Sequence, residues 1–251
     1  MHDMSRFLLL CALSVSFLTY GKEVVTLATS EWTPYQSKRL KHDGFVTQIV
    51  VEAFEKEGYE VELAYLPWVR GYELVKQGKL DGTFIWAFSK EREKDFLFSE
   101  PVIHLALSIF HRSNMQLNWN NPSDFSQYRI GGQIGFDYGL SELEKNETLT
   151  IFRIANAEGN YHKLTNNRLD IILDFTDVGY HLINKLGLTG QITASPKPLN
   201  TRAYSLLISK QSPRARELIN AFNRGIKKMR DSAQIEKYKQ ASQRGEYLKP
   251  K

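Results

Sequence analysis

The sequence predicts an α/β fold of two similar lobes joined by two crossover strands. Short β-rich runs alternate with helical patterns between residues 24 and 86, and the same order returns between residues 129 and 173. Strands that alternate with helices are typical of a mainly parallel sheet covered on both faces. Two further apolar runs, 105–110 and 202–209, mirror each other, as strands that connect two lobes would.

The first repeat has the order strand, helix, strand, helix, strand. Its strands are predicted at 24–29, 60–66 and 82–88, and its helices follow Gly44 and Pro67. Pro34 ends the first strand, and the apolar residues after Gly44 fall on one helix face. Gly78-Lys79-Leu80-Asp81 forms a tight turn into the last strand, which should end near Trp86.

The second repeat follows the same plan. Residues 123–125 form a turn, strands are predicted at 129–134, 148–154 and 171–173, and helices at 140–146 and 157–167. Arg168-Leu169-Asp170 stands before the last of these strands, as Lys79-Leu80-Asp81 stands before 82–88. We therefore expect each lobe to have its own sheet, with residues 22–112 and 200–251 in lobe 1 and 113–199 in lobe 2.

The last part of the chain should return to lobe 1. After the strand at 202–209, Ser212-Pro213 has the form of a helix start, and a final helix is predicted at 233–242. From Lys210 onwards the chain holds 12 Lys and Arg against 4 Asp and Glu, in a protein of formal net charge +5. We attribute this to a solvated helix face rather than to nucleic-acid binding, with contact to an anionic membrane or partner as the alternative.

The first 21 residues have the pattern of a signal peptide. Arg6 precedes the apolar run 7–18, which is too short to span a bilayer, and Gly21 provides a small residue before the expected cleavage at Lys22. An uncleaved membrane anchor is the alternative. Cys11, the only cysteine, lies in this run, so the mature chain should have no thiol. We predict export to the periplasm.

The composition, with 42% hydrophobic and 24% charged residues, is that of a folded globular protein. The sequence contains no HExxH, GxSxG or P-loop motif and no spaced Cys/His cluster. We therefore predict no cofactor, no metal site and no catalytic activity.

One stretch of the sequence points to a family. A G-K-x-D turn, an apolar strand, a loop with an arginine and an F-S-x-P segment follow one another at Gly78, Lys79, Asp81, Arg92, Phe98, Ser99 and Pro101. This order resembles the family 3 extracellular solute-binding proteins of the polar amino-acid uptake type. The resemblance runs from Val24 to the last helix. It implies the type II periplasmic binding protein fold and an ABC-type transporter as the partner.

The resemblance also implies binding residues in lobe 1. Arg92 would hold a ligand carboxylate, since a guanidinium offers paired donors; the alternative is a surface arginine that pairs with its acidic neighbours. Trp32 and Trp68 stand where family members carry rings that enclose the ligand, with core packing as the alternative. The other candidates beside them are Tyr35, Arg70, Trp86 and Phe88.

The candidates in lobe 2 depart from the pattern of α-amino acid binders. Asp137 and Tyr138 replace a hydroxyl-rich turn. Asp174 stands one position before the place where such binders carry an aspartate for the ammonium group, and Phe175 occupies that place. Helix capping is the alternative role for Asp174.

We therefore predict a monomeric periplasmic protein that captures a small polar or aromatic solute, amino-acid-like and with a carboxylate, for an inner-membrane transporter. Two alternatives stay open. One is an enzyme similar to cyclohexadienyl dehydratases, with Glu31, Asp137 or Asp174 as acid or base. The other is a ligand-sensing partner of a membrane receptor.

Overall fold

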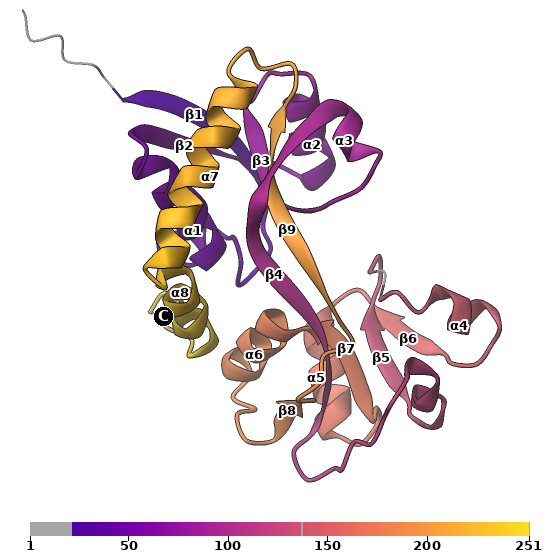
Figure 1. The fold of residues 1–251 in the computed structure, drawn as a ribbon. Coiled ribbons are helices and arrows are strands. Elements are labelled where there is room, and N and C mark those ends of the chain that lie inside the picture. The colour runs from indigo at the N-terminus through magenta and orange to yellow at the C-terminus, as the bar shows by residue number, and fades with distance from the viewer. Residues whose placement is uncertain (1–21, 137, 251) are drawn as a thin grey trace, which may run out of the picture.

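The computed structural model describes residues 22–136 and 138–250. The predicted signal peptide, 1–21, and the predicted site residue Asp137 lie outside the described residues. Figure 1 shows two groups of helices and strands connected by two long strands, β4 (Phe96–Arg112) and β9 (Asn200–Ser209). We call the group that contains the described N- and C-terminal segments the first half and the other group the second half.

The first half contains three parallel strands, which follow the predicted order. They are β1 (Glu23–Thr29), β2 (Tyr59–Tyr65) and β3 (Gly82–Ala87), with α1 (Phe45–Glu55), α2 (Trp68–Lys76) and the short η1 (Lys41–Asp43) and α3 (Arg92–Asp95) between or after them. Gly44, before α1, has φ +99°, and a Cβ there would lie 2.5 Å from the Tyr35 carbonyl oxygen. Only glycine fits such a position without strain.

The two C-terminal helices pack against α1 of the first half, and the second of them also contacts α6 (Thr176–Lys185) of the second half. They are α7 (Ala215–Asp231) and α8 (Gln234–Gln243). Gly225 of α7 lies against the backbone of Ala53 in α1, so the two helices approach closely. Next to this contact, the nearly buried Glu57 pairs with Arg224 at 2.6 Å and with Lys228 at 2.7 Å. Among the described residues, no helix has the length and apolar character that a bilayer crossing requires.

The second half repeats the plan of the first. Its elements are η2 (Pro122–Gln127), β5 (Ile130–Gln133), α4 (Ser141–Lys145), β6 (Ile151–Ile154), α5 (Ala157–Thr165), β7 (Ile171–Phe175), α6 (Thr176–Lys185) and β8 (Ile192–Ala194). Strand β5 pairs in parallel with β6 and β7. Neither α6 nor β8 was predicted from the sequence.

The prediction that each half has a separate sheet is wrong. The strands form one sheet in the order β2-β1-β3-β9-β4-β7-β5-β6, with β8 paired to β4. The reason is that β4 is much longer than the apolar run that predicted it: it pairs with β9 from Phe96 onwards and with β7 up to His111. The two crossover strands thus join both halves into one hydrogen-bonded sheet. Strand β9 pairs with β3 of the first half and β4 with β7 of the second, and both pairs are antiparallel, as is the pair of β4 with β9.

The turn before the last parallel strand makes the same contacts in both halves. The Asp81 amide donates to the Thr26 carbonyl at 2.9 Å, and the Asp81 carboxylate accepts from the Thr26 amide at 2.9 Å. The Asp170 amide donates to the Arg129 carbonyl at 2.9 Å, and its carboxylate accepts from the Arg129 amide at 2.9 Å. Each aspartate therefore fastens its turn to the neighbouring strand.

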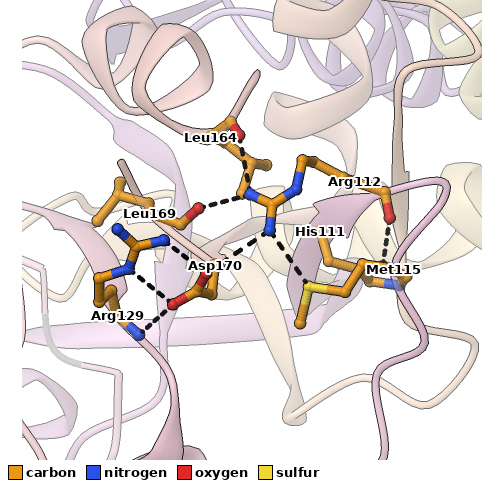
Figure 2. Close-up of polar contacts among 7 residues, drawn as sticks. All are labelled: His111, Arg112, Met115, Arg129, Leu164, Leu169 and Asp170. Atoms are coloured by element: carbon orange, nitrogen blue, oxygen red, sulfur yellow. Dashed lines mark hydrogen bonds and ion pairs between the residues drawn. The ribbon is translucent and has the colours of Figure 1, made fainter. Parts of the chain in front are cut away.

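In the second half this turn is reinforced by two arginines (Figure 2). The Arg129 guanidinium donates to both oxygens of Asp170, each at 2.9 Å. Arg112, at the end of β4, lies 3.6 Å from the same carboxylate and donates to the carbonyls of Leu164 and Leu169. The Arg129 contact holds the pKa of Asp170 down at about 2. The cluster is structural, because these groups contact one another.

Candidate functional site

A cavity of about 500 Å³ is lined by residues from both halves. Its lining residues are Glu31, Trp32, Trp68, Ile85 and Trp86 from the first half and Gln133 and Phe136 from the second. Its size and its mostly apolar lining are those of small-molecule sites. Several of these residues lie at the carboxyl ends of parallel strands. Trp32 follows β1, Trp86 lies near the end of β3, and Gln133 is the last residue of β5. In α/β sheets this edge is where ligands bind.

A β-bulge in β3 turns two consecutive residues towards the cavity. Thr83 pairs with Leu207 and Trp86 with Ser205, so β3 has one extra residue between these pairs. Ile85 lies in this bulge, and its backbone φ is +65°, in a region that β-branched residues rarely adopt. Without the bulge, Ile85 and Trp86 would point to opposite faces of the sheet. Such local strain is often found at functional sites.

Aromatic rings from both halves meet around the cavity, edge to face. The Trp68 ring centroid lies 6.1 Å from that of Trp32 and 5.4 Å from that of Trp86. Phe175, at the end of β7, lies 5.6 Å from Trp32 and 6.0 Å from Phe136. Phe175 therefore connects the rings of the first half with the second half, and such contacts stabilise a preformed aromatic wall.

Glu31 is the charged residue among the described lining residues. Its carboxylate accepts hydrogen bonds from the Ser37 hydroxyl at 2.5 Å and from the Lys38 amide at 3.2 Å. Arg39 lies 3.8 Å away, with 80% of its side chain exposed. The loop after β1 therefore holds a carboxylate at the mouth of the cavity.

Arg92 lies beside the cavity and is not among its lining residues. Its guanidinium carbon is 5.0 Å from the centroid of the Trp86 ring, and its Nη1 donates to the Ala87 carbonyl at 3.0 Å. Burial raises the pKa of Tyr204, and the positive charges of Arg202 and Arg92 oppose this shift. Arg92 thus stands close to the aromatic wall, with one donor already used by the backbone.

The structure places the ten predicted site residues in three groups. Trp32, Trp68 and Trp86 line the cavity. Tyr35 and Tyr138 are buried behind it: Tyr35 packs 4.8 Å from Trp32, and the Tyr138 hydroxyl accepts from the Gln133 amide at 2.6 Å. Of the other five, Asp137 lies outside the described residues, and Arg70, Phe88, Arg92 and Asp174 are not lining residues.

Asp174 is buried inside the second half. Its carboxylate accepts from the Tyr161 hydroxyl at 3.0 Å and from the Phe175 amide at 2.8 Å. Burial raises the pKa of Asp174 to about 7, and these two hydrogen bonds oppose the shift. Phe88 and Arg70 are exposed on the first half, where Phe88 packs against Phe98 with centroids 5.2 Å apart.

Three lining residues were not predicted from the sequence, namely Ile85, Gln133 and Phe136, and Glu31 was predicted only as a catalytic acid or base of the enzyme alternative. No pattern in the sequence indicated Ile85, because the bulge that positions it depends on how β3 pairs with the distant strand β9. Gln133 and Phe136 could have been found, because Gln133 lies near the carboxyl end of the predicted strand 129–134 and Phe136 follows that strand, at the position that corresponds to the loop after β1.

A larger surface hollow of about 580 Å³ lies within the second half, around Trp119. There Lys197 lies over the Trp119 ring at 4.4 Å, and Phe125 packs against the same ring at 5.1 Å. The lining of this hollow comes from the second half alone and is the more polar of the two, whereas the cavity is lined from both halves and is mostly apolar, which makes the cavity the better candidate site.

The sequence matches the model of the bacterial extracellular solute-binding proteins, family 3, over residues 24–241. The chain belongs to this family. Its fold is the type II periplasmic binding protein fold, as predicted. No curated protein sequence matches the chain.

Several solved structures share the fold at low sequence identity. Substrate binding domain 2 of Lactococcus lactis GlnP, in an open conformation, has a TM-score of 0.70 at 19% identity over 92% of this chain and 97% of that chain. AbpA of Streptococcus pneumoniae, bound to L-arginine, has a TM-score of 0.64 at 17% identity over 91% and 97%. A histidine kinase sensor domain has a TM-score of 0.64 at 16% identity over 90% and 96%.

Proposed function

We propose that this family 3 protein is a non-catalytic periplasmic binding protein that encloses a small amino-acid-like solute in the aromatic cavity between its halves. The observation that carries the proposal is the lining itself: three tryptophans of the first half face Gln133 and Phe136 of the second. A site with walls on two separately packed bodies can close around its ligand, which excludes water and strengthens polar contacts.

The moving bodies in this proposal are lobe 1, residues 22–112 and 200–251, and lobe 2, residues 113–199. Each has a separate core: one cluster contains Val25, Phe54 and Phe222, and another contains Phe125, Ile130 and Leu173. Strands β4 and β9 pass between them and would bend when the lobes close. Register irregularities in this strand pair, between Phe98 and Ile103, provide places where pairing is already interrupted.

The solute would bring its carboxylate to Arg92. The guanidinium lies over Trp86, a cavity wall, and its remaining donors suit a carboxylate. A solute with an apolar or aromatic body would fit the tryptophan surfaces. That the related fold of AbpA was solved with L-arginine supports an amino-acid-like solute.

Binding and turnover can be measured together. We would screen the twenty amino acids, amines and aromatic acids by thermal shift, titrate each hit by calorimetry, and analyse the mixture for product after prolonged incubation. The proposal expects a saturable hit with no product. Conversion of a hit would favour the dehydratase-like alternative, whereas the absence of any binding by folded protein would contradict a solute-binding function.

A matched pair of variants locates the binding. Trp68→Phe changes a cavity wall, whereas Trp119→Phe changes the fourth tryptophan, which lies in the second half outside the cavity. The proposal expects weaker binding for the first variant and unchanged binding for the second.

The partner in this proposal is an inner-membrane transporter, reached by a mature monomer that begins near Lys22. N-terminal sequencing of the periplasmic form tests the export step. Because a histidine kinase sensor domain shares the fold, delivery to a receptor is the competing role. Uptake of labelled solute by cells with and without this protein separates transport from sensing.

A further inference from the structure

We propose that the solute carries a cationic group, an alkylated ammonium or a guanidinium, which binds between the tryptophan rings and the carboxylate of Glu31. This inference rests on the proposed function and names the chemical class that its cavity selects.

The aromatic walls are suited to a cation. Trp32 and Trp68 meet at 77°, and Trp68 and Trp86 meet at 85°, so their rings form a corner. Aromatic faces attract a positive charge that lies within about 6 Å of the ring centroid. The Trp86 indole N–H is already donated to the Thr83 hydroxyl at 3.1 Å. That ring therefore offers no donor to an anion, and because Arg92 already lies over it at 5.0 Å, the π surfaces left for a solute cation are those of Trp32 and Trp68.

The charge at the cavity has the matching sign. Glu31 lines the cavity, and no lysine or arginine is among the described lining residues. The Ser37 hydroxyl and the Lys38 amide each use one acceptor site of the carboxylate. An ionised carboxylate has about four such sites, so Glu31 can accept further hydrogen bonds. Arg39, at 3.8 Å and largely exposed, neutralises it only weakly.

Asp174, the acidic residue near the end of β7, does not provide this negative charge. Asp174 is buried, is not a lining residue, and accepts from Tyr161 and the Phe175 amide. The Phe175 ring, in turn, contacts Trp32 and Phe136. Among the described lining residues, the second half therefore contributes the Phe136 ring and the Gln133 amide, and Glu31 of the first half provides the negative charge.

The test compares each cation with a neutral molecule of the same shape. The probes are choline with 3,3-dimethylbutan-1-ol, and arginine with citrulline; phenylalanine and glutamate serve as amino acids without a cationic side chain. Calorimetric titrations use the wild type, Glu31→Gln and Glu60→Gln. Glu60→Gln removes the same charge, but Glu60 lies near the start of β2, paired with Val24, and not at the carboxyl end of the strands where the cavity lies. Thermal unfolding without solute confirms that each variant is folded.

The inference predicts that at least one cation binds about tenfold or more tightly than its neutral counterpart. Glu31→Gln should reduce this ratio by roughly tenfold, and Glu60→Gln should leave it unchanged. Equal binding within both pairs, an unchanged ratio in Glu31→Gln, or binding of phenylalanine or glutamate alone would overturn the inference while the solute-binding function stands. If folded wild type bound no solute in this panel or in the wider screen, the proposed function itself would fail, and the inference with it.

Discussion

Arg92 lies over the indole ring of Trp86, with its guanidinium carbon 5.0 Å from the ring centroid. The same side chain donates to the Ala87 carbonyl at 3.0 Å, and the Arg92 amide donates to the Ser89 hydroxyl at 3.2 Å. Arg92 thus fastens the loop between β3 and α3 next to a cavity wall. A residue that the sequence singled out for ligand binding therefore also contributes to the loop that positions it.

Replacement of Arg92 should affect both binding and stability. Arg92→Ala should weaken binding of a carboxylate-bearing solute by about 2–5 kcal/mol, as for a truncated buried charge pair. The lost hydrogen bond and ring contact should lower the free energy of unfolding by about 1–2 kcal/mol. Calorimetry and urea unfolding measure the two effects. Arg92→Lys keeps the charge without the paired donors, so its affinity should fall between the other two; equal affinities in all three proteins would remove Arg92 from the site.

Asp170 should make the second half sensitive to acid. Its pKa is lowered to about 2 by the contact with Arg129, so its stabilising effect is complete above the unfolded pKa of about 4 and is lost as the pH falls towards 2. Wild type should lose roughly 2 kcal/mol of unfolding free energy from this group over that range. Asp170→Asn should be less stable at pH 6 and lose less on acidification. Parallel pH profiles of the two proteins, measured by urea unfolding, would speak against this role.

Asp174 should have the opposite pH dependence. Burial raises its pKa to about 7, so the folded state disfavours the ionised form. Its contribution to stability is therefore present below pH 4 and is lost as the pH rises through about 7, by up to about 4 kcal/mol. Asp174→Asn should unfold at a higher temperature than wild type at pH 8, and this advantage should shrink at pH 5. A variant that is less stable than wild type at both pH values would contradict this explanation.

The C-terminal helix connects the two halves at α6. The Gln243 side chain donates to Asp177 at 3.0 Å, and its carbonyl accepts from Asn184 at 2.8 Å. Gln243→Ala should increase amide hydrogen exchange in the first turn of α6 and in α8 together. Gln240→Ala is the matched control, because the Gln240 side chain donates to Glu236 of its own helix. If the two variants exchanged alike, the side-chain bond would not hold these helices together.

Much of the fold could be predicted because its signals are local. Alternating apolar runs located β1 to β3, and the Arg168-Leu169-Asp170 turn indicated a repeat, which the Asp170 contacts with Arg129 now explain. The single sheet could not be predicted, because it depends on how far β4 pairs with β9. Helix α6 lacked an obvious start signal, since Phe175 precedes it and no side chain caps it.

The candidate site was predicted only in part for the same reason. The tryptophans were recognisable by residue type, and all three predicted ones line the cavity. Whether a neighbouring ring is buried, as Tyr35 is, depends on packing against distant residues such as Phe45. Glu31 and Gln133 are about a hundred positions apart, and only the tertiary fold brings them to one cavity.

A crystal structure of the protein with the tightest solute of the panel tests the central claim most directly. The account predicts unmodified solute between Trp32, Trp68 and Phe136, with its cationic group near Glu31 and its carboxylate near Arg92. A solute bound elsewhere, such as the hollow around Trp119, or density for a converted product in the cavity, would contradict it.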